Sequence, residues 1–215
     1  MMKHLADWLP LLAHGALQSA KMMLIAYVIA LVFGAVLMLM RRSRFRLISG
    51  IAGIYITAIR GTPVLAQLFF IYFGLAEMGL VMSSWQAAII GLGGNSAAYV
   101  AEIYRAGIES VSRGQIEAAR SMGLRRFQIT RLVVLPQMVT VVLPPLANQA
   151  VVLIKETSVA SLIAAPELMH EARDLAAEFY MPLELYLLAG LMYLMLAFPL
   201  SVLARHLEAR LRIER

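Results

Sequence analysis

Residues 112–136 read SRGQIEAARSMGLRRFQITRLVVLP, a charged stretch that interrupts a mostly apolar chain. Ser112, followed by Gln115 three residues later, has the pattern of a capping box, which predicts that a helix begins there. Gly123 can adopt the left-handed conformation that ends a helix. We therefore predict a short, separate helix over residues 112–123. Its paired alanines, Ala118 and Ala119, would let another backbone approach closely.

The composition indicates a membrane protein. Of the 215 residues, 61% are hydrophobic and 15% are charged, which is too apolar for a soluble domain of this size. The formal net charge of +6 comes from basic clusters at the ends of apolar runs, a pattern typical of cytoplasmic loops rather than of a nucleic-acid surface. The chain has no cysteine, which excludes disulfides and thiolate metal sites, and its histidines lack zinc spacing. The clusters are Arg41, Arg42, Arg44 and Arg46; Arg113, Arg120, Arg125, Arg126 and Arg131; and Arg205, Arg210, Arg212 and Arg215.

Five apolar runs are predicted to cross the membrane, at residues 22–40, 47–75, 85–106, 132–154 and 183–203. The basic clusters then place the N-terminus outside and the C-terminus in the cytoplasm. Trp8 is expected to anchor the first helix at the membrane interface. The first run is too long for a signal peptide and its basic flank follows it, so no cleaved signal is expected.

The second run is divided by Arg60-Gly61-Thr62-Pro63. Proline removes a helix hydrogen bond, so a kink or break is expected here. A charge at Arg60 within an apolar run is costly unless it faces protein, water or headgroups. Both a functional Arg60 and one that extends to the inner membrane surface fit this position. In the third run, Glu102 and Arg105 are three residues apart and are expected to pair.

Polar side chains recur within the apolar runs. Asn95 lies on a small-residue face of the third run, where it would bond a neighbouring helix or line a path. In the fourth run, Asn148 and Lys155 are seven residues apart, as are Gln149 and Glu156, so each pair shares a helix face. These groups would either join helices through hydrogen bonds and a structural ion pair, or line a path for a zwitterionic solute.

The opening stretch also resembles the EAA loop of the membrane subunits of bacterial ABC importers. In that family this loop forms a coupling helix that docks into a groove of the ATP-hydrolysing subunit, and the helix here would include Arg120. The family usually has isoleucine where this chain has Val133. The other reading of the stretch is an interfacial amphipathic helix that tethers the chain to lipid headgroups. The motif residues are Glu117, Ala118, Ala119, Gly123, Val133, Leu135 and Pro136.

Four further segments are similar to the polar amino acid branch of these permeases, which includes histidine, arginine, glutamine and cystine systems: residues 60–69, 95–99, 143–148 and 153–158. The resemblance implies an all-α, type I transmembrane domain over residues 1–215, with five transmembrane helices and a cytoplasmic coupling helix at residues 112–123. It also implies a bacterial inner-membrane location and transport of a polar L-amino acid. The implied partners are a second permease copy or homologue, two ATP-binding cassette subunits and an extracytoplasmic amino acid binding protein.

In arginine-type relatives the solute lies against polar residues of the fourth span, which here correspond to Gln149 and Glu156. The residues that we expect along the solute path are Gln149, Glu156, Asn95, Thr62, Asn148 and Lys155.

The chain has no Gly-rich phosphate loop, so we expect ATP and Mg²⁺ to be bound by a partner subunit, with no enzyme activity and no cofactor in this chain. A secondary transporter that uses an ion gradient is the alternative. It would need buried carboxylates and often an internal repeat, whereas only Glu156 qualifies and no repeat is visible. A membrane enzyme is a third class, and neither G-x-S-x-G nor H-E-x-x-H is present.

Overall fold

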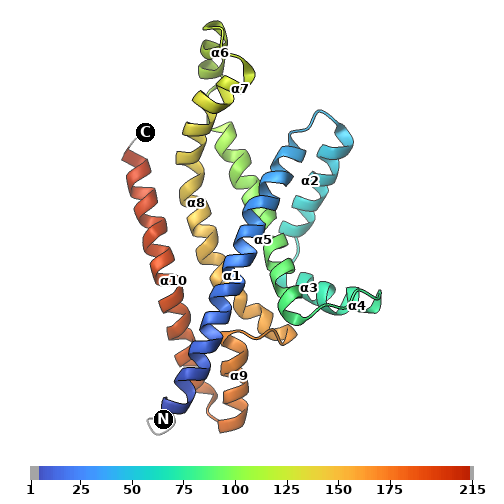
Figure 1. The fold of residues 1–215 in the computed structure, drawn as a ribbon, viewed down its shortest axis with the longest axis vertical. Helices are drawn as coiled ribbons and strands as arrows, with labels where there is room; N and C mark the ends of the chain where they lie inside the picture. The colour runs from blue at the N-terminus through green and yellow to red at the C-terminus, as the bar shows by residue number, and fades with distance from the viewer. Residues whose placement is uncertain (1–4, 214–215) are drawn as a thin grey trace.

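The structure, a computed structural model, describes residues 5–213, and every regular element within them is a helix (Figure 1). The all-α prediction is therefore confirmed. Arg215, the last member of the third basic cluster, lies outside the described residues. The elements are α1 (Leu5–Arg41), α2 (Arg46–Arg60), α3 (Val64–Phe69), η1 (Phe70–Gly74), α4 (Leu75–Glu77), α5 (Ser84–Glu109), α6 (Arg113–Ser121), α7 (Arg126–Ile129), η2 (Thr130–Val134), α8 (Leu135–Glu156), η3 (Thr157–Ile163), α9 (Leu168–Phe179) and α10 (Pro182–Ile213).

The first helix begins well before the predicted run, at Leu5 rather than at residue 22. Its early turns pack against α9, and this contact overturns the prediction for Trp8. Trp8 is only 1% exposed and meets Phe179 edge to face, with ring centroids 5.5 Å apart. A side chain covered by protein on this scale cannot act as an interface anchor.

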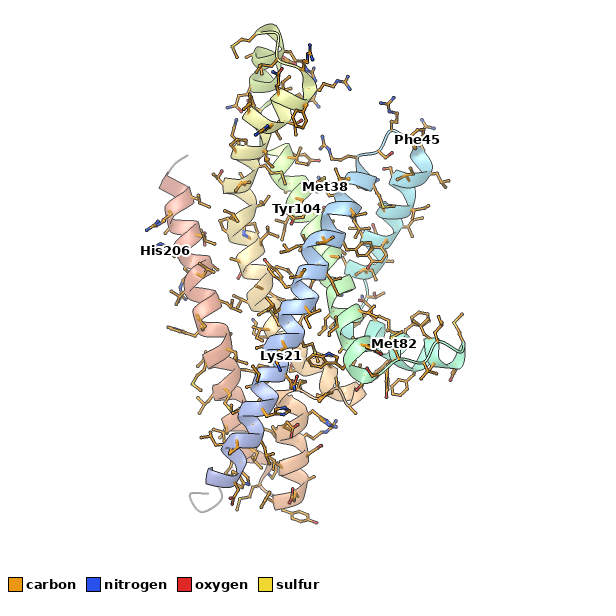
Figure 2. The ribbon with its side chains drawn as sticks, in the orientation of Figure 1. Lys21, Met38, Phe45, Met82, Tyr104 and His206 are labelled. Carbon is orange, nitrogen blue, oxygen red and sulfur yellow. The ribbon has the colours of Figure 1, made fainter. Side chains whose placement is uncertain are left out.

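Helices α1 and α5 lie side by side along much of their length (Figure 1). Small residues allow this approach, because a Cβ on Gly34 would lie 2.7 Å from Cγ1 of Val100. On the small-residue face predicted for the third run, a Cβ on Gly93 of α5 would lie 3.0 Å from Cγ2 of Ile29 on α1, so this face is a packing face. Towards the upper end, Met38 of α1 and Tyr104 of α5 belong to one apolar cluster (Figure 2).

The predicted break in the second run is present. α2 ends at Arg60, the chain restarts as a helix at Val64, and the two segments differ in direction by 111°. The segment α3–η1–α4 therefore forms an arm that projects sideways from α5 instead of continuing α2 (Figure 1). The short element η1 is a π-helical turn, as is η2 before α8.

Three described helical stretches are long and apolar enough to cross a membrane: 7–41, 126–163 and 182–211. The bent pair of α2 and the arm makes a fourth if it counts as one span. α5 has 26 residues, or about 39 Å at 1.5 Å per residue, which is long enough to cross. Its glycines, Asn95 and charged end make it less apolar than the others, so a total of five spans stays a prediction.

The two ends of the molecule differ in charge. The turn after α1, the helices α6 and α7, and the end of α10 lie towards one end, and α9 lies at the other beside the start of α1 (Figure 1). The described basic clusters thus gather towards the end opposite the acidic segment 166–182.

Helix α9 is fixed by a buried carboxylate. Glu167 is fully buried, and its Oε1 accepts a hydrogen bond from the backbone N–H of His170 at 2.7 Å. Its Oε2 accepts hydrogen bonds from Ser19 of α1 at 3.2 Å and from the Tyr193 hydroxyl of α10. One side chain therefore joins α1, α9 and α10. Tyr180, which ends α9, has a left-handed conformation with φ 54°.

Candidate functional site

The helices α6 and α7 form a hairpin over residues 112–129 that projects beyond the bundle (Figure 1). Ser112 Oγ accepts a hydrogen bond from the Gln115 backbone N–H at 3.4 Å and so caps α6. The return bond from the Gln115 side chain does not form within the described residues, so only half of the predicted capping box is present. Gly123 has φ +81° and its N–H donates to the Arg120 carbonyl at 2.9 Å, as predicted for a helix end.

The hairpin exposes the charged residues of the motif. Glu117, Ala118 and Arg120 are exposed, whereas Ala119 is only 2% exposed. α6 packs against α7 and η2 of the same chain. Ala119 therefore packs within the hairpin, and Ala118 is left on the surface.

Two large apolar side chains lie on the hairpin surface and were not singled out from the sequence. Met122 is 74% exposed and Phe127 is 73% exposed. Apolar side chains that gather with charged ones on a projecting element are typical of a surface that a partner covers. The sequence signal that could have identified them is the presence of a large apolar residue on each side of the turn at Gly123.

A second group of candidates lies at the break of α2. Thr62 Oγ1 accepts a hydrogen bond from Gln67 Nε2 at 2.9 Å, and Gln67 Oε1 accepts one from Asn95 Nδ2 at 3.0 Å. The structure thus joins the predicted residues Thr62 and Asn95 through Gln67, which was not among the candidates. The signal for Gln67 was a lone amide in the apolar run that follows the break. These three side chains line a cavity of about 540 Å³ that is otherwise mostly apolar.

The candidates on α8 do not converge on one point. Gln149 Nε2 donates a hydrogen bond to Ser96 Oγ of α5 at 3.3 Å. A hydrogen bond between helices is one of the two roles that the sequence allows for Gln149. Glu156 shares this face, and its Oε2 is buried without a hydrogen-bond partner among residues 5–213. Asn148 and Lys155 are both exposed, and Asn148 lines a groove of about 610 Å³ between α8 and α10.

The predicted pair on α5 forms. The Arg105 guanidinium donates to Glu102 Oε2 at 2.7 Å and to Glu109 Oε2 at 2.6 Å. Arg60, at the end of α2, approaches Glu102 with Nη1 3.7 Å from Oε2. Charged groups therefore follow α5 from the break of α2 to the base of the hairpin. Within the described part of the chain, no three His, Asp or Glu side chains are grouped as a metal site would require.

Comparisons with known proteins agree on one family. The family model described as "binding-protein-dependent transport system inner membrane component" matches residues 26–213. The probable glutamine ABC transporter permease protein GlnM of Bacillus subtilis (strain 168) is 38% identical over 192 residues, which cover 87% of this chain and 89% of the relative. The arginine transport system permease protein ArtQ of the same organism is 34% identical and covers 95% of this chain and 94% of the relative.

Solved structures show the same likeness. A crystal structure of an amino acid ABC transporter with histidines has a chain that is 35% identical, with a TM-score of 0.92 over 98% of both chains. The MetNI methionine ABC transporter in an inward-facing conformation gives a TM-score of 0.73 at 21% identity, over 93% of this chain and 95% of that one. At that identity the second likeness concerns the fold alone.

Proposed function

Since the chain belongs to the family of binding-protein-dependent transport system inner membrane components, we propose that it is the permease subunit of an ATP-driven importer of polar L-amino acids. Relatives named as glutamine, arginine and cystine permeases support the solute class. The near-complete overlap with the chain of an amino acid ABC transporter supports the assembly.

The observation that carries the proposal is the projecting hairpin and its connections. Residues 110–112 join it to α5, and η2 joins it to α8. The two helices are in close contact where Gly107 of α5 meets Val142 of α8. A displacement of α6 would therefore reach two helices of the bundle at once. Glu117, Ala118, Arg120 and Gly123 are exposed there for a partner, and Ala119 holds the hairpin together.

The mechanism follows from linkage. Two ATPase subunits bind ATP and Mg²⁺, close on each other and move the coupling helix over residues 112–123. The attached helices then reopen towards the other side of the membrane. ATP drives this change only through its different affinity for the two states. This chain supplies no catalytic group and no cofactor site to the reaction.

The remaining partners complete the path. A second copy of the permease, or a homologue, forms the other half of the path, and an extracytoplasmic binding protein delivers the amino acid. Thr62, Asn95, Gln149 and Glu156 are the residues that we assign to the path within the bundle, and Asn148 and Lys155 are assigned to its exposed rim. Residues 1–215 act as a single transmembrane domain.

The proposal places the chain in a bacterial inner membrane, with its N-terminus outside and its C-terminus in the cytoplasm. The separation of basic and acidic ends supports this orientation, because basic loops stay in the cytoplasm. The hairpin then lies on the cytoplasmic side, where an ATPase subunit can reach it.

The test is amino acid uptake into liposomes that hold the permease with its ATPase subunits and its binding protein. We expect uptake to require ATP and to continue when ionophores collapse the proton and sodium gradients. Uptake that stops with the gradients and ignores ATP would instead support the ion-driven transporter. Uptake of sugars or metal ions but not of amino acids would overturn the solute class.

A further inference from the structure

The break between α2 and α3 leaves irregular backbone on the surface of the subunit. Gly61, Thr62 and Pro63 are all exposed, although the segments on both sides are apolar. In a bilayer, backbone outside regular structure is tolerated only where it is covered by protein or lines a water-filled cavity. In the proposed transporter the break would therefore face protein or water rather than lipid.

Arg60 ends α2 at this break and is 44% exposed. Its guanidinium lies over the ring of Tyr99, 5.4 Å from the ring centroid. Its nearest acidic atom, Oε2 of Glu102, is 3.7 Å away, which is too long for a hydrogen bond. Guanidinium carries five N–H donors, and none of them donates a hydrogen bond to another described residue.

Glu102 does not need Arg60 as its main partner. Arg105 already donates to both of its oxygens, at 3.2 Å to Oε1 and 2.7 Å to Oε2. The geometry thus holds the Glu102 carboxylate in place through Arg105 and leaves the Arg60 donors free. An arginine with uncommitted donors is suited to bind a carboxylate through two parallel hydrogen bonds.

The surroundings of Arg60 form a continuous polar strip. Asn95, Tyr99 and Glu102 are four and three residues apart, so they share one face of α5. That face meets the break, because Asn95 bonds Gln67 beyond it and Tyr99 and Glu102 meet Arg60 before it. The strip extends about 10 Å along α5 at 1.5 Å per residue.

We propose that Arg60 is a solute-binding residue of the translocation path that takes the α-carboxylate of the transported amino acid at the break between α2 and α3. The fixed carboxylate of Glu102 lies beside it, where it attracts the α-ammonium of the same zwitterion. This inference rests on the proposed function. It adds Arg60 of α2 and Glu102 of α5 to the path residues Thr62, Asn95, Gln149 and Glu156.

The proposed role of Arg60 differs from the role of an arginine that only extends to the membrane surface. A surface arginine would contribute through its charge and stem and would be indifferent to the solute. A binding residue would distinguish an amino acid from its α-amide, in which a neutral group replaces the carboxylate. This contrast gives the experiment its readout.

The natural chain has no cysteine, so Thr62→Cys places a single thiol in the permease at the break. The assembled complex with its ATPase subunits would be treated with a membrane-impermeant maleimide, with and without ATP, in vesicles of both orientations. The ligand would be whichever of L-glutamine, L-arginine, L-histidine and L-cystine the unmodified complex takes up, compared with its α-amide. Leu194→Cys is the control, because Leu194 is 60% exposed on the apolar face of α10.

We expect the thiol at position 62 to react and the thiol at position 194 to stay unlabelled. The amino acid should slow labelling at position 62, and its α-amide should not at the same concentration. Adding Arg60→Gln should raise the half-protecting concentration by about 10- to 100-fold, the range for loss of a charged hydrogen bond. Arg60→Lys should raise it less, because the charge remains.

Three results would overturn the inference: no labelling at position 62 in any state, equal protection by acid and amide, or protection unchanged by Arg60→Gln. If Thr62→Cys prevents assembly, Ala58→Cys, on an exposed residue one turn earlier, carries the same measurement. Failure of the unmodified complex to take up any amino acid would refute the proposed function itself. Normal ATP-driven uptake with any of the three results above would refute only the role of Arg60.

Discussion

Replacing Gly107 by alanine tests whether α5 and α8 pack as closely as the structure shows. Gly107 is buried in α5. A Cβ at this position would overlap Cγ1 of Val142 and lie 3.1 Å from Cγ of Met138, both on α8. Valine is stiff at χ1 in a helix, so the overlap is relieved only if the two helices move apart. These helices also carry the hairpin.

The size of the effect follows from two opposing terms. Overpacking a closely packed site costs about 1–3 kcal/mol, and exchanging glycine for alanine inside a helix gains about 0.5–1 kcal/mol. The midpoints of the two ranges leave a net loss of about 1 kcal/mol. For a chain of this size, that loss lowers the unfolding midpoint by about 2–4 °C.

The assay is thermal unfolding of the assembled complex in one detergent. Gly190→Ala is the matched control, because a Cβ there meets no atom within 4 Å, and its midpoint should stay constant or rise slightly. The double variant Gly107→Ala/Val142→Ala should be no less stable than Val142→Ala alone, because the overlapping methyl is gone. If Gly107→Ala matched Gly190→Ala, the packing of α5 against α8 would be wrong.

Three further variants probe other sites. Glu117→Lys should lower ATP-driven uptake and co-purification of the ATPase subunit on the order of tenfold. Glu178→Lys is the control, because it makes the same charge change at an exposed residue of α9, and it should leave co-purification intact. Equal effects of the two substitutions would contradict the coupling role of Glu117. Glu156→Gln should change the amino acid preference or the solute stimulation of ATP hydrolysis, because Oε2 is buried without a partner in the described chain; an unchanged profile would make Glu156 structural. Burial raises the pKa of the Glu167 carboxyl, and this effect outweighs that of the hydrogen bonds, which lower the pKa. The stabilising contribution of the carboxyl is therefore full below the ordinary glutamate pKa. It is lost as the pH rises through the raised pKa. The thermal midpoint should fall across that window, and Glu167→Gln should flatten the curve; a curve unchanged by the substitution would contradict this account.

Local signals predicted the elements that depend on local chemistry. Arg60-Gly61-Thr62-Pro63 predicted the break, because proline and glycine act on their own turn of the chain. Gly123 predicted the end of α6 for the same reason. The Glu102–Arg105 pair followed from helix spacing alone. The angle of the break, 111°, could not be predicted, because tertiary contacts of the arm determine it.

Long-range contacts account for the features that the sequence did not predict correctly. Trp8 was placed at the membrane interface because nothing near it in sequence reveals that α9 covers it. Glu167 was not among the residues predicted from the sequence, although it joins α1, α9 and α10 through Ser19 and Tyr193. Glutamate is not among the preferred N-cap residues, so its bond to the His170 N–H could not be predicted from the sequence.

The contacts among the candidate path residues could be predicted only in part. Thr62 and Asn95 proved to be neighbours, but the residue that joins them, Gln67, became visible only when the break folded the arm back towards α5. Gln149 and Glu156 share a helix face as their spacing indicated, yet they do not touch the Thr62 group. Helical spacing predicts which residues share a face, and it does not say which helix that face meets.

The π-helical turn η2 gives a physical meaning to the fixed gap between Gly123 and Leu135-Pro136. Such a turn closes its hydrogen bonds over one more residue than an α-helical turn does, and each residue of an α-helix advances the chain by about 100°. Loss of one residue from 130–134 would swing α6 around the axis of α8 by about that angle. The gap therefore sets the azimuth at which Glu117 would meet the proposed ATPase subunit, and a single insertion there would misalign the proposed coupling helix with every motif residue still in place.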